Sequence, residues 1–339
     1  MNLYMFGIIY LFTCLLALSP RSIPSRYFFL FWFSTMILLS LSLRLNFMPD
    51  PDTDMATYAM NMAITEYILP YHAREFVFWL GSRFLYQLLA DPGWVFFVMD
   101  LVLFISFYHG VKLNKAFFKE YINPENIRYL LFGAFLFFPY FHGLENSYRQ
   151  ILAVCIGLLA LGCAHRSPRK GSILLIASFF IHNVLVVLAP VFIMLKNGRF
   201  STIITTVLIL VVFIALYMIS NSTNPLVQKS GGIEIGQRIG LIYAFVVVFI
   251  GIFIAIFEID YRKKVNTLLM RVLAYFILLY LASYMLLPSQ GAERMLFLIM
   301  SILYPVLGIY LEVAFKSGYL VRLFYTHITL APMLYFGSF

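Results

Sequence analysis

Apolar stretches long enough to cross a lipid bilayer follow one another from Leu3 almost to Phe339. A membrane-spanning helix needs about 20 apolar residues, and only helices and closed barrels satisfy their backbone polar groups within hydrocarbon. Hydrophobic residues make up 62% of the chain and charged residues 12%, whereas a soluble domain carries about twice that charge. The sequence therefore predicts an all-α, polytopic integral membrane protein.

About twelve apolar windows are separated by turn and charge signals. Two consecutive windows, 171–182 and 184–195, are each too short to cross about 30 Å of hydrocarbon. They form either one long span or two half-helices broken around His182 and Asn183, so about 10–12 transmembrane helices are predicted, some broken or half-length. Residues 1–339 are predicted to form a single membrane domain, with no internal repeat. The windows are 3–19, 27–47, 93–109, 129–141, 150–164, 171–182, 184–195, 201–219, 239–257, 265–287, 295–312 and 322–337.

The basic residues indicate the orientation, because the cytoplasmic loops of membrane proteins are enriched in Lys and Arg. With alternating sides, 17 of the 24 Lys and Arg fall on one side, which is therefore predicted to be cytoplasmic. Both termini and the segments 48–92 and 220–238 are predicted to lie outside. The bias survives only if the chain reverses at His182, which favours the two half-helices. The basic residues predicted outside are Arg44, Arg74, Arg83, Arg149, Lys229, Arg238 and Arg294.

The remaining composition argues against other classes of protein. The formal net charge of +9 follows from this topology, and no basic cluster interleaved with exposed aromatic residues indicates nucleic-acid binding. Cys14, Cys155 and Cys163 lie inside apolar runs, so they are interpreted as small buried hydrophobic residues rather than as a disulfide framework or metal site. No metal or cofactor is predicted.

Three aspartates alternate at Asp50, Asp52 and Asp54, which invites a metal-binding interpretation. An EF-hand loop needs Gly and Glu where this chain has Met55 and Asn61. A metal site for nucleotide sugars is disfavoured as well, because the segment is predicted to lie outside. Helix N-capping by Asp52 or Asp54 is the structural alternative.

The outer segment 48–92 carries an amphipathic helix pattern over residues 60–89. Polar and aromatic residues recur there every four positions and therefore share one helical stripe. The stripe either faces solvent on an interfacial helix or lies across the mouth of a cavity on the outer face. Its members are Glu75, Trp79, Arg83 and Gln87.

The strongest polar signal runs from His142 to Gln150, at the outer end of one span and the start of the next. His142, Glu145 and Arg149 share one face if the second helix begins early, and Glu145 and Arg149 then form a structural i, i+4 ion pair. Arg149 also opens an apolar run at membrane depth, where a guanidinium suits bidentate binding of phosphate. Both interpretations stay open.

Two further polar groups are predicted near the outer side. His182 lies between apolar half-segments and is either a hydrogen-bonded core residue or part of a cavity lining, which a broken helix at membrane depth favours. Glu293 and Arg294 begin the next-to-last span and add another cation to the same side of the protein.

Together these residues resemble the EpsG family of bacterial membrane polysaccharide polymerases, relatives of the Wzy O-antigen and capsule polymerases. The resemblance covers about 46–300 of the chain, and an Arg149-Gln150 pair with His182 downstream is its most specific part. The matching features are Asp52-Thr53-Asp54 with Tyr58 after an early span, Glu75 ahead of an aromatic helix, Ser147-Tyr148-Arg149-Gln150 opening a small-residue span, the basic hairpin Arg166–Lys170, Phe180-Ile181-His182, and Glu293-Arg294.

The resemblance implies a multi-pass protein of the bacterial cytoplasmic (inner) membrane, with its active site facing the periplasm or outside. It implies a glycosyltransferase that polymerises oligosaccharide repeat units on undecaprenyl pyrophosphate into O-antigen, capsule or exopolysaccharide chains, without a nucleotide sugar. Its partners are then the lipid-linked oligosaccharide and the lipid bilayer, together with a chain-length regulator and a flippase of the same pathway, and no nucleic acid.

This interpretation requires cations for the diphosphate and a base for the acceptor hydroxyl. The candidates for the diphosphate are Arg149 and Arg294, with Arg83 in addition. The candidate bases are His182, Asp54 and Glu75, and the sequence does not choose among them. The candidates for stacking on sugar faces are Tyr58, Trp79 and Tyr148. The further substrate-binding candidates are Gln150, Glu145, His142, Asp52 and Glu293.

A transporter or flippase of an anionic lipid-linked saccharide is the alternative, because it would also use intramembrane Arg, a broken helix and an aromatic cavity. Inverted repeats are not visible, however, and the charged residues gather on one side. A membrane-bound acyltransferase is a weaker alternative.

Overall fold

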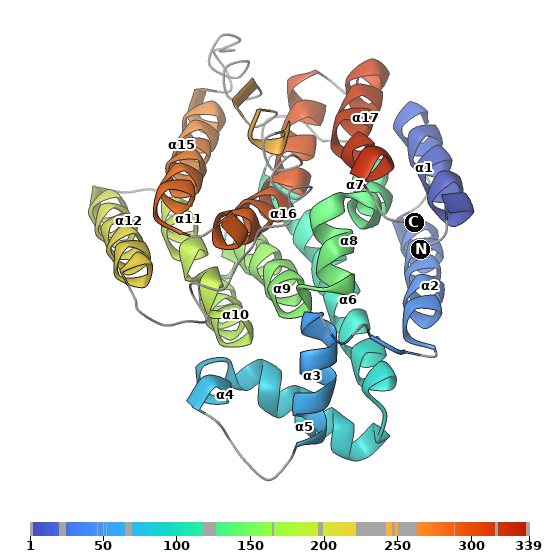
Figure 1. The fold of residues 1–339 in the computed structure, drawn as a ribbon. Coiled ribbons are helices and arrows are strands. Elements are labelled where there is room, and N and C mark those ends of the chain that lie inside the picture. The colour runs from blue at the N-terminus through green and yellow to red at the C-terminus, as the bar shows by residue number, and fades with distance from the viewer. Residues whose placement is uncertain are drawn as a thin grey trace. The chain divides into compact units, whose positions relative to one another are not determined.

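Every regular element that the computed structural model describes is helical (Figure 1). The described residues are 3–19, 25–45, 47–49, 51, 53–64, 70–117, 127–164, 166–195, 199–221, 242–245, 248–249, 263–287, 289–315 and 318–336. The α-helices are α1 (Leu3–Leu18), α2 (Ser25–Arg44), α3 (Asp54–Ala63), α4 (Pro70–Arg74), α5 (Phe76–Leu89), α6 (Pro92–Phe117), α7 (Arg128–Gly133), α8 (Phe138–Glu145), α9 (Tyr148–Ala164), α10 (Pro168–Ile181), α11 (Leu188–Met194), α12 (Arg199–Ser220), α15 (Lys263–Leu286), α16 (Ser289–Ala314) and α17 (Tyr319–Phe336). Two 3₁₀ helices are η1 (Ala134–Leu136) and η2 (Asn183–Val187).

Five of the described helices are long and apolar enough to cross a membrane, namely α2, α6, α12, α15 and α16. The 22 residues of α12 extend about 33 Å, which matches the thickness of the hydrocarbon layer. Shorter apolar helices include α9. The prediction of an all-α, polytopic membrane protein is confirmed, whereas the total of 10–12 spans stays a prediction. Most of the predicted span 239–257 and all but the first residues of the loop 220–238 lie outside the described residues.

The predicted window 129–141 is not one helix. It divides into α7, η1 and α8, and Phe137 between them is extended, with φ −73° and ψ 120°. Pro139 stands in the first turn of α8, where its missing N–H is tolerated, although in a helix interior it would remove a hydrogen bond. The proline therefore explains why a new helix begins here.

The break predicted at His182 is present. Helix α10 ends at Ile181, and His182 is extended, with φ −151° and ψ 113°. The chain continues in the 3₁₀ helix η2 and then in α11. The interruption leaves helical hydrogen-bonding groups near His182 free to bind side chains.

The described chain divides into two compact units, which we describe separately. The first comprises Met1–Leu185 and Tyr304–Leu330, and the second comprises Val186–Leu303 and Ala331–Ser338. Helix α16 thus contributes its first half to the second unit and its remainder to the first. The prediction of one membrane domain stays a prediction.

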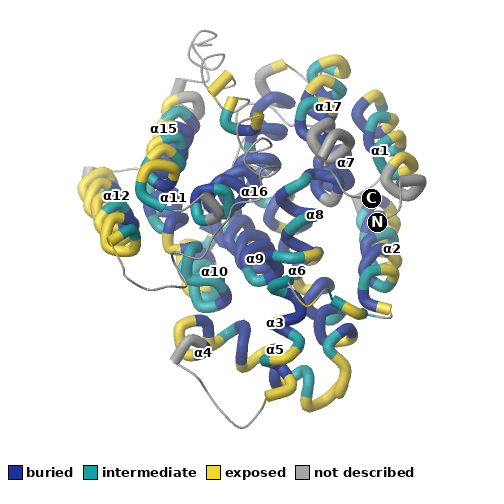
Figure 2. The backbone as a smooth tube through the Cα atoms, viewed as in Figure 1, coloured by how far each residue is buried: buried dark blue, intermediate teal, exposed yellow. Residues whose placement is uncertain are grey.

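In the first unit, α6 and α9 approach each other closely because glycines face the contact. A Cβ atom on Gly162 would lie 2.6 Å from Cβ of Leu113, and one on Gly110 would lie 3.0 Å from the backbone N of Leu159. The side-chain amide of Asn114 donates to the backbone oxygens of Gly110, at 2.9 Å, and Leu158, at 3.0 Å. Small residues and interhelical amide hydrogen bonds are typical of tight helix contacts in membranes. Helix α9 is buried along most of its length (Figure 2).

Candidate functional site

The carboxylate of Glu75 joins three separate parts of the first unit. Its Oε2 accepts a hydrogen bond from Nη1 of Arg149, with which it forms an ion pair. Its Oε1 accepts one from Nδ1 of His182 at 2.7 Å and one from the backbone N–H of Asn183 at 3.2 Å. We call Glu75, Arg149 and His182 the Glu75 cluster. No other segment of the described chain shows a carboxylate shared between an Arg and a His.

Local structure explains how these side chains meet. Glu75 precedes the first residue of α5, Arg149 lies in the first turn of α9, and His182 follows the last residue of α10. The backbone N–H of Asn183 is available to a side chain because α10 has ended there. The helix break thus supplies both a side-chain donor and a backbone donor to one carboxylate.

Aromatic rings surround the Arg149 guanidinium. Its central carbon lies 4.8 Å from the ring centre of Tyr58, 5.3 Å from that of Trp79 and 5.9 Å from that of Phe78. Each contact is within cation–π range. The aromatic residues come from α3 and α5, and they are almost fully buried. Arg149 is therefore held by an ion pair and by stacked rings, while its side chain keeps 12% exposure.

The charges in the cluster lower the pKa of Glu75, which lies between α4 and α5 and outside the candidate membrane spans. Burial alone raises this pKa, but the hydrogen bond from His182, the charge of Arg149 and the hydrogen bond from the backbone N–H of Asn183 outweigh it and hold the pKa below its usual value. Glu75 is therefore ionised at neutral pH, and its oxygens act as hydrogen-bond acceptors.

A second set of contacts braces α5 against α3 and α4. Nη2 of Arg83 donates to Nδ1 of His72 at 2.9 Å, and its Nε donates to the backbone oxygen of Asn61 at 3.3 Å. Burial, and then the charges of Arg83 and Arg149, lower the pKa of His72, so that its neutral ring accepts the hydrogen bond. The His72 ring also packs against Trp79, with centroids 4.7 Å apart. Figure 1 draws these three helices together below α9 and α10.

This arrangement is suited to proton transfer beside an anion. Because Nδ1 of His182 donates to an ionised carboxylate, Nε2 is the ring nitrogen that can take up a proton. A carboxylate that orients an imidazole in this way is a recurring device of general-base catalysis. The neighbouring guanidinium supplies positive charge for a phosphate or an oxyanion.

The family profile of the EpsG family matches residues 29–338 and thus contains the whole Glu75 cluster. The chain belongs to the EpsG family. The resemblance noted from the sequence is confirmed, and membership indicates a polysaccharide-polymerase-like role. No curated protein and no solved structure matches the chain.

In this EpsG-family protein the stripe on α5 faces the interior over most of its length. Glu75, Trp79 and Arg83 are 3%, 0% and 6% exposed, whereas Gln87 is exposed. The interpretation as a solvent-facing stripe is therefore wrong, because α3, α4 and the start of α9 cover this face of the helix.

Of the two interpretations of Arg149, the structural one, a helical pair with Glu145, is also wrong. Helix α8 ends at Glu145, and Asn146 leaves helical geometry with φ −136° and ψ −66°. The i, i+4 spacing therefore does not apply, and His142, Glu145 and Arg149 do not share one helical face. Arg149 pairs instead with Glu75, 74 residues away.

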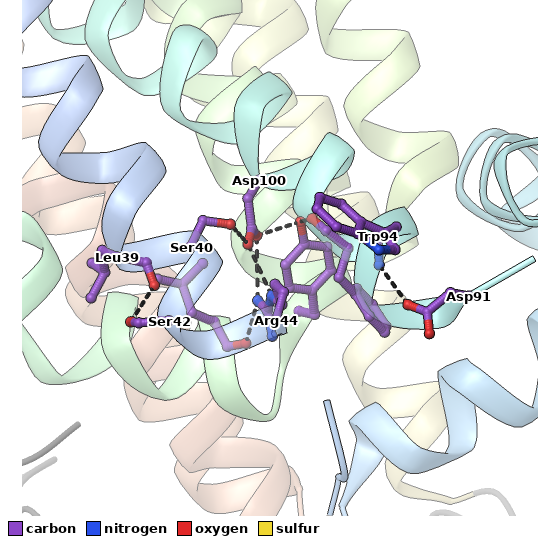
Figure 3. Close-up of polar contacts among 10 residues, drawn as sticks. Leu39, Ser40, Ser42, Arg44, Asp91, Trp94 and Asp100 are labelled. Carbon is purple, nitrogen blue, oxygen red and sulfur yellow. Dashed lines mark hydrogen bonds and ion pairs between the residues drawn. The ribbon is translucent and has the colours of Figure 1, made fainter. Parts of the chain in front are cut away.

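A buried pair of Arg44 and Asp100 was not predicted. Oδ2 of Asp100 accepts from Nε of Arg44 at 2.9 Å and from the hydroxyl of Ser40 at 2.6 Å (Figure 3). Nη2 of Arg44 donates to Oδ1 of Asp100 at 3.3 Å and to the backbone oxygen of Leu144 at 3.1 Å. The available signal was a lone aspartate in the middle of an apolar run, since an intramembrane charge implies a partner.

Tyr148 belongs to the Arg44–Asp100 pair. It is fully buried, and its hydroxyl donates to Oδ1 of Asp100 at 2.8 Å. Its ring packs against Phe96, with centroids 5.1 Å apart. These contacts favour a structural role for Tyr148 over stacking on a sugar.

The other candidate residues are more dispersed. Asp54 is the first residue of α3, and Thr53 forms the N-cap of this helix. Oδ2 of Asp54 accepts a hydrogen bond from the Tyr58 hydroxyl at 3.4 Å. Gln150 is buried in α9, and the His142 ring stacks on Phe138 in α8. Glu293 and Arg294 lie on α16 in the second unit. Asp52 lies outside the described residues.

Among the residues that the structure describes, no three His, Cys, Asp or Glu side chains gather as a metal site requires.

Proposed function

We propose that this protein is a membrane glycosyltransferase that polymerises oligosaccharide units carried on undecaprenyl diphosphate, at the outer face of the cytoplasmic membrane. The observation that carries the proposal is the Glu75 cluster, in which a carboxylate orients an imidazole beside a guanidinium. The proposed product is an O-antigen, capsule or exopolysaccharide chain. Family membership supports the polysaccharide-polymerase-like role.

In the proposed reaction, His182 acts as the general base. Nε2 takes the proton of the acceptor hydroxyl while that oxygen attacks the anomeric carbon of the donor sugar. The bond from this carbon to the diphosphate breaks, and its electron pair leaves with the diphosphate. The lowered pKa of Glu75 argues against Glu75 as the base, because a weakly basic carboxylate takes up a proton poorly at neutral pH. Glu75 is therefore a positioning residue.

Arg149 is the proposed ligand of the leaving diphosphate. One of its N–H groups is used by Glu75, and a guanidinium has five in all, arranged in a rigid fork that suits phosphate. The rings of Tyr58 and Trp79 lie against it, so little side-chain freedom remains to be lost on binding. Arg294 lies in the second unit, and its role as a diphosphate ligand stays a prediction from the sequence.

Incubation of the purified protein with lipid-diphosphate-linked repeat units, without a nucleotide sugar, tests the proposal. A ladder of longer products on a gel is expected. The variant His182→Gln should lower the initial rate by about a hundredfold or more, the lower range for general-base catalysis. His109→Gln, at an exposed histidine of α6, is the matched control and should retain the ladder. Unchanged substrate with the folded wild-type protein would contradict the proposal and argue for transport.

The outer location requires a separate test, because it rests on the distribution of basic residues. In a variant without native cysteines, single cysteines at Ser167 and Ser230 should react with impermeant reagents from opposite sides of the membrane, with Ser167 inside. Ser230 lies outside the described residues. Labelling of both positions from the same side would overturn the topology.

A further inference from the structure

The second unit contains a polar cavity that the proposed reaction does not use. It has a volume of about 310 Å³ and lies between the first half of α12 and the middle of α15, which pack together (Figure 1). Its polar lining consists of Ser201, Thr202, Thr205, Thr206, Arg271 and Tyr275. A guanidinium beside a hydroxyl group whose O–H is not used within the protein is suited to binding phosphate.

Thr205 contributes a buried hydroxyl that is not used by the described residues around it. Its side chain is 8% exposed, and its buried Oγ1 has no hydrogen-bond partner in the described part of the chain. Its neighbours differ, since Thr206 donates to the backbone oxygen of Thr202 at 3.0 Å and Ser201 donates to that of Ile193 at 2.6 Å. A buried hydroxyl without a partner is costly, so an acceptor from a ligand would stabilise this position.

Arg271 supplies the charge. It is exposed, and it makes neither an ion pair nor a side-chain hydrogen bond with any residue that the structure describes. A cation on an apolar helix needs an anionic partner or water. The cavity thus presents the Arg271 guanidinium and the Thr205 hydroxyl to a single anion.

The surroundings of the cavity are apolar and exposed. Figure 2 shows α12 as exposed over most of its length. In a membrane-spanning helix, exposed side chains of this kind contact acyl chains. A ligand of the cavity should therefore join an anionic group to a hydrocarbon tail. The exposed apolar residues near the cavity are Ile203, Val207, Leu210, Leu278 and Leu281.

We propose that this cavity binds the phosphate of an anionic membrane phospholipid, with Arg271 and the Thr205 hydroxyl as donors and the acyl chains along α12 and α15. On the predicted topology, both helices begin on the cytoplasmic side, next to Arg199, Lys263 and Lys264. Basic pockets between spans on this side are suited to anionic lipid head groups. The site is independent of the polymerase chemistry.

Native mass spectrometry of the detergent-purified protein tests the proposal with phosphatidylglycerol as the probe and phosphatidylcholine as the neutral comparison. Wild type should retain phosphatidylglycerol, and Arg271→Gln should weaken this binding by about tenfold or more, because a charge-assisted hydrogen bond is lost. Arg169→Gln, at an exposed basic residue in α10, is the matched control and should bind as wild type does. Thr205→Val should weaken binding, whereas Thr205→Ser, which keeps the hydroxyl, should not.

Three results would overturn the proposal. Equal loss in Arg271→Gln and Arg169→Gln would indicate attraction to overall charge only. Equal retention of both lipids would indicate that the phosphate charge is not recognised. Arg271-dependent binding of inorganic phosphate, added alone at the same concentration, would identify a soluble phosphate rather than a lipid as the ligand. The folded state of each variant is checked by gel filtration before the measurement.

Discussion

Two of the Arg–carboxylate pairs in the first unit, Arg44–Asp100 and Arg149–Glu75, differ in what surrounds them. The side chains of Arg44 and Asp100 are 4% and 0% exposed. In the Glu75 cluster the carboxylate is as deeply buried, at 4%, but the side chains of Arg149 and His182 keep 12% and 18% exposure. The Arg44–Asp100 pair is buried on both sides, whereas the side chains of Arg149 and His182 in the Glu75 cluster remain partly accessible.

The partners of the two carboxylates explain this difference. Asp100 receives hydrogen bonds from Ser40, Arg44 and Tyr148, all of which are buried. A buried pair of this kind contributes little net stability, but loss of one member leaves an uncompensated charge. Glu75 instead divides its oxygens between the Arg149 guanidinium and the His182 ring. An Arg–carboxylate pair thus connects helices at Asp100, whereas in the Glu75 cluster it positions the proposed reactive groups.

The largest effect is expected when Asp100 is changed to Asn. The substitution leaves the Arg44 charge buried without compensation, which costs about 3–5 kcal/mol. The amount of protein that elutes as a single monodisperse peak after detergent extraction should fall steeply. Replacing both members, with Arg44→Met and Asp100→Leu, should restore much of the folded fraction. Wild-type yield from Asp100→Asn alone would remove the distinction between the two pairs.

The next effect is expected from Arg149→Lys, and it should fall on activity rather than on folding. Lysine can still pair with Glu75, but it lacks the planar fork for a diphosphate and the stacking on Tyr58 and Trp79. Polymerisation should drop by about tenfold or more, equivalent to about 1.4 kcal/mol, while the protein level in membranes stays close to normal. A complementation assay for long polysaccharide chains, run beside an immunoblot, measures both quantities. Full chain length from the Lys variant would exclude Arg149 from the reaction.

A smaller effect is expected from Tyr148→Phe. This change removes one hydroxyl from Asp100 and keeps the ring in place, so it should cost about 1 kcal/mol of stability. The thermal unfolding temperature in detergent should decrease, and the polymerisation rate of the folded protein should not change. A reduced rate at unchanged stability would place Tyr148 with the reactive residues instead.

The smallest effect is expected on the stability of the protein as the pH is lowered. Because the pKa of Glu75 is lower in the folded protein, its contribution is fully present above the pKa of the unfolded chain, about 4.3. It is lost as the pH falls through the folded pKa. The difference in unfolding temperature between wild type and Glu75→Gln should be constant from about pH 8 to pH 6 and should shrink below about pH 4. A difference that grows in acid has the opposite sign and would contradict the ionised carboxylate.

Much of the helical framework was predictable from local composition. Helix α12 matches the window 201–219 and α15 matches 265–287 to within a few residues, because long apolar runs have few alternatives in a membrane. The break at His182 was predictable for another reason, since the distribution of basic residues required a reversal there. The helix break at Phe137 was not predicted, because a single proline, Pro139, within an apolar run is a weak signal.

The residues of the site were partly predictable from the sequence, but which of them contact each other was not. Glu75, Arg149 and His182 were each singled out as polar residues in apolar surroundings. A sequence reports spacing along one helix, so the only partner that it offered for Arg149 was Glu145. The actual partner depends on where α8 stops and on how α5 packs, and both are tertiary features. Asp100 shows the same limit, because its environment is formed by residues from α2, α6 and α9.

Because α9 is rigid, a change in its contact with α6 at Gly162 would displace its other end, where Arg149 lies. Gly162 lies about 20 Å along the helix axis from Arg149, at about 1.5 Å per residue. If a methyl group at Gly162 pushed Leu113 away and tilted α9 by about 5°, Arg149 at the far end would move by about 2 Å. That displacement exceeds the tolerance of a hydrogen bond. The position of the guanidinium relative to Glu75 therefore depends partly on the packing at the opposite end of the helix.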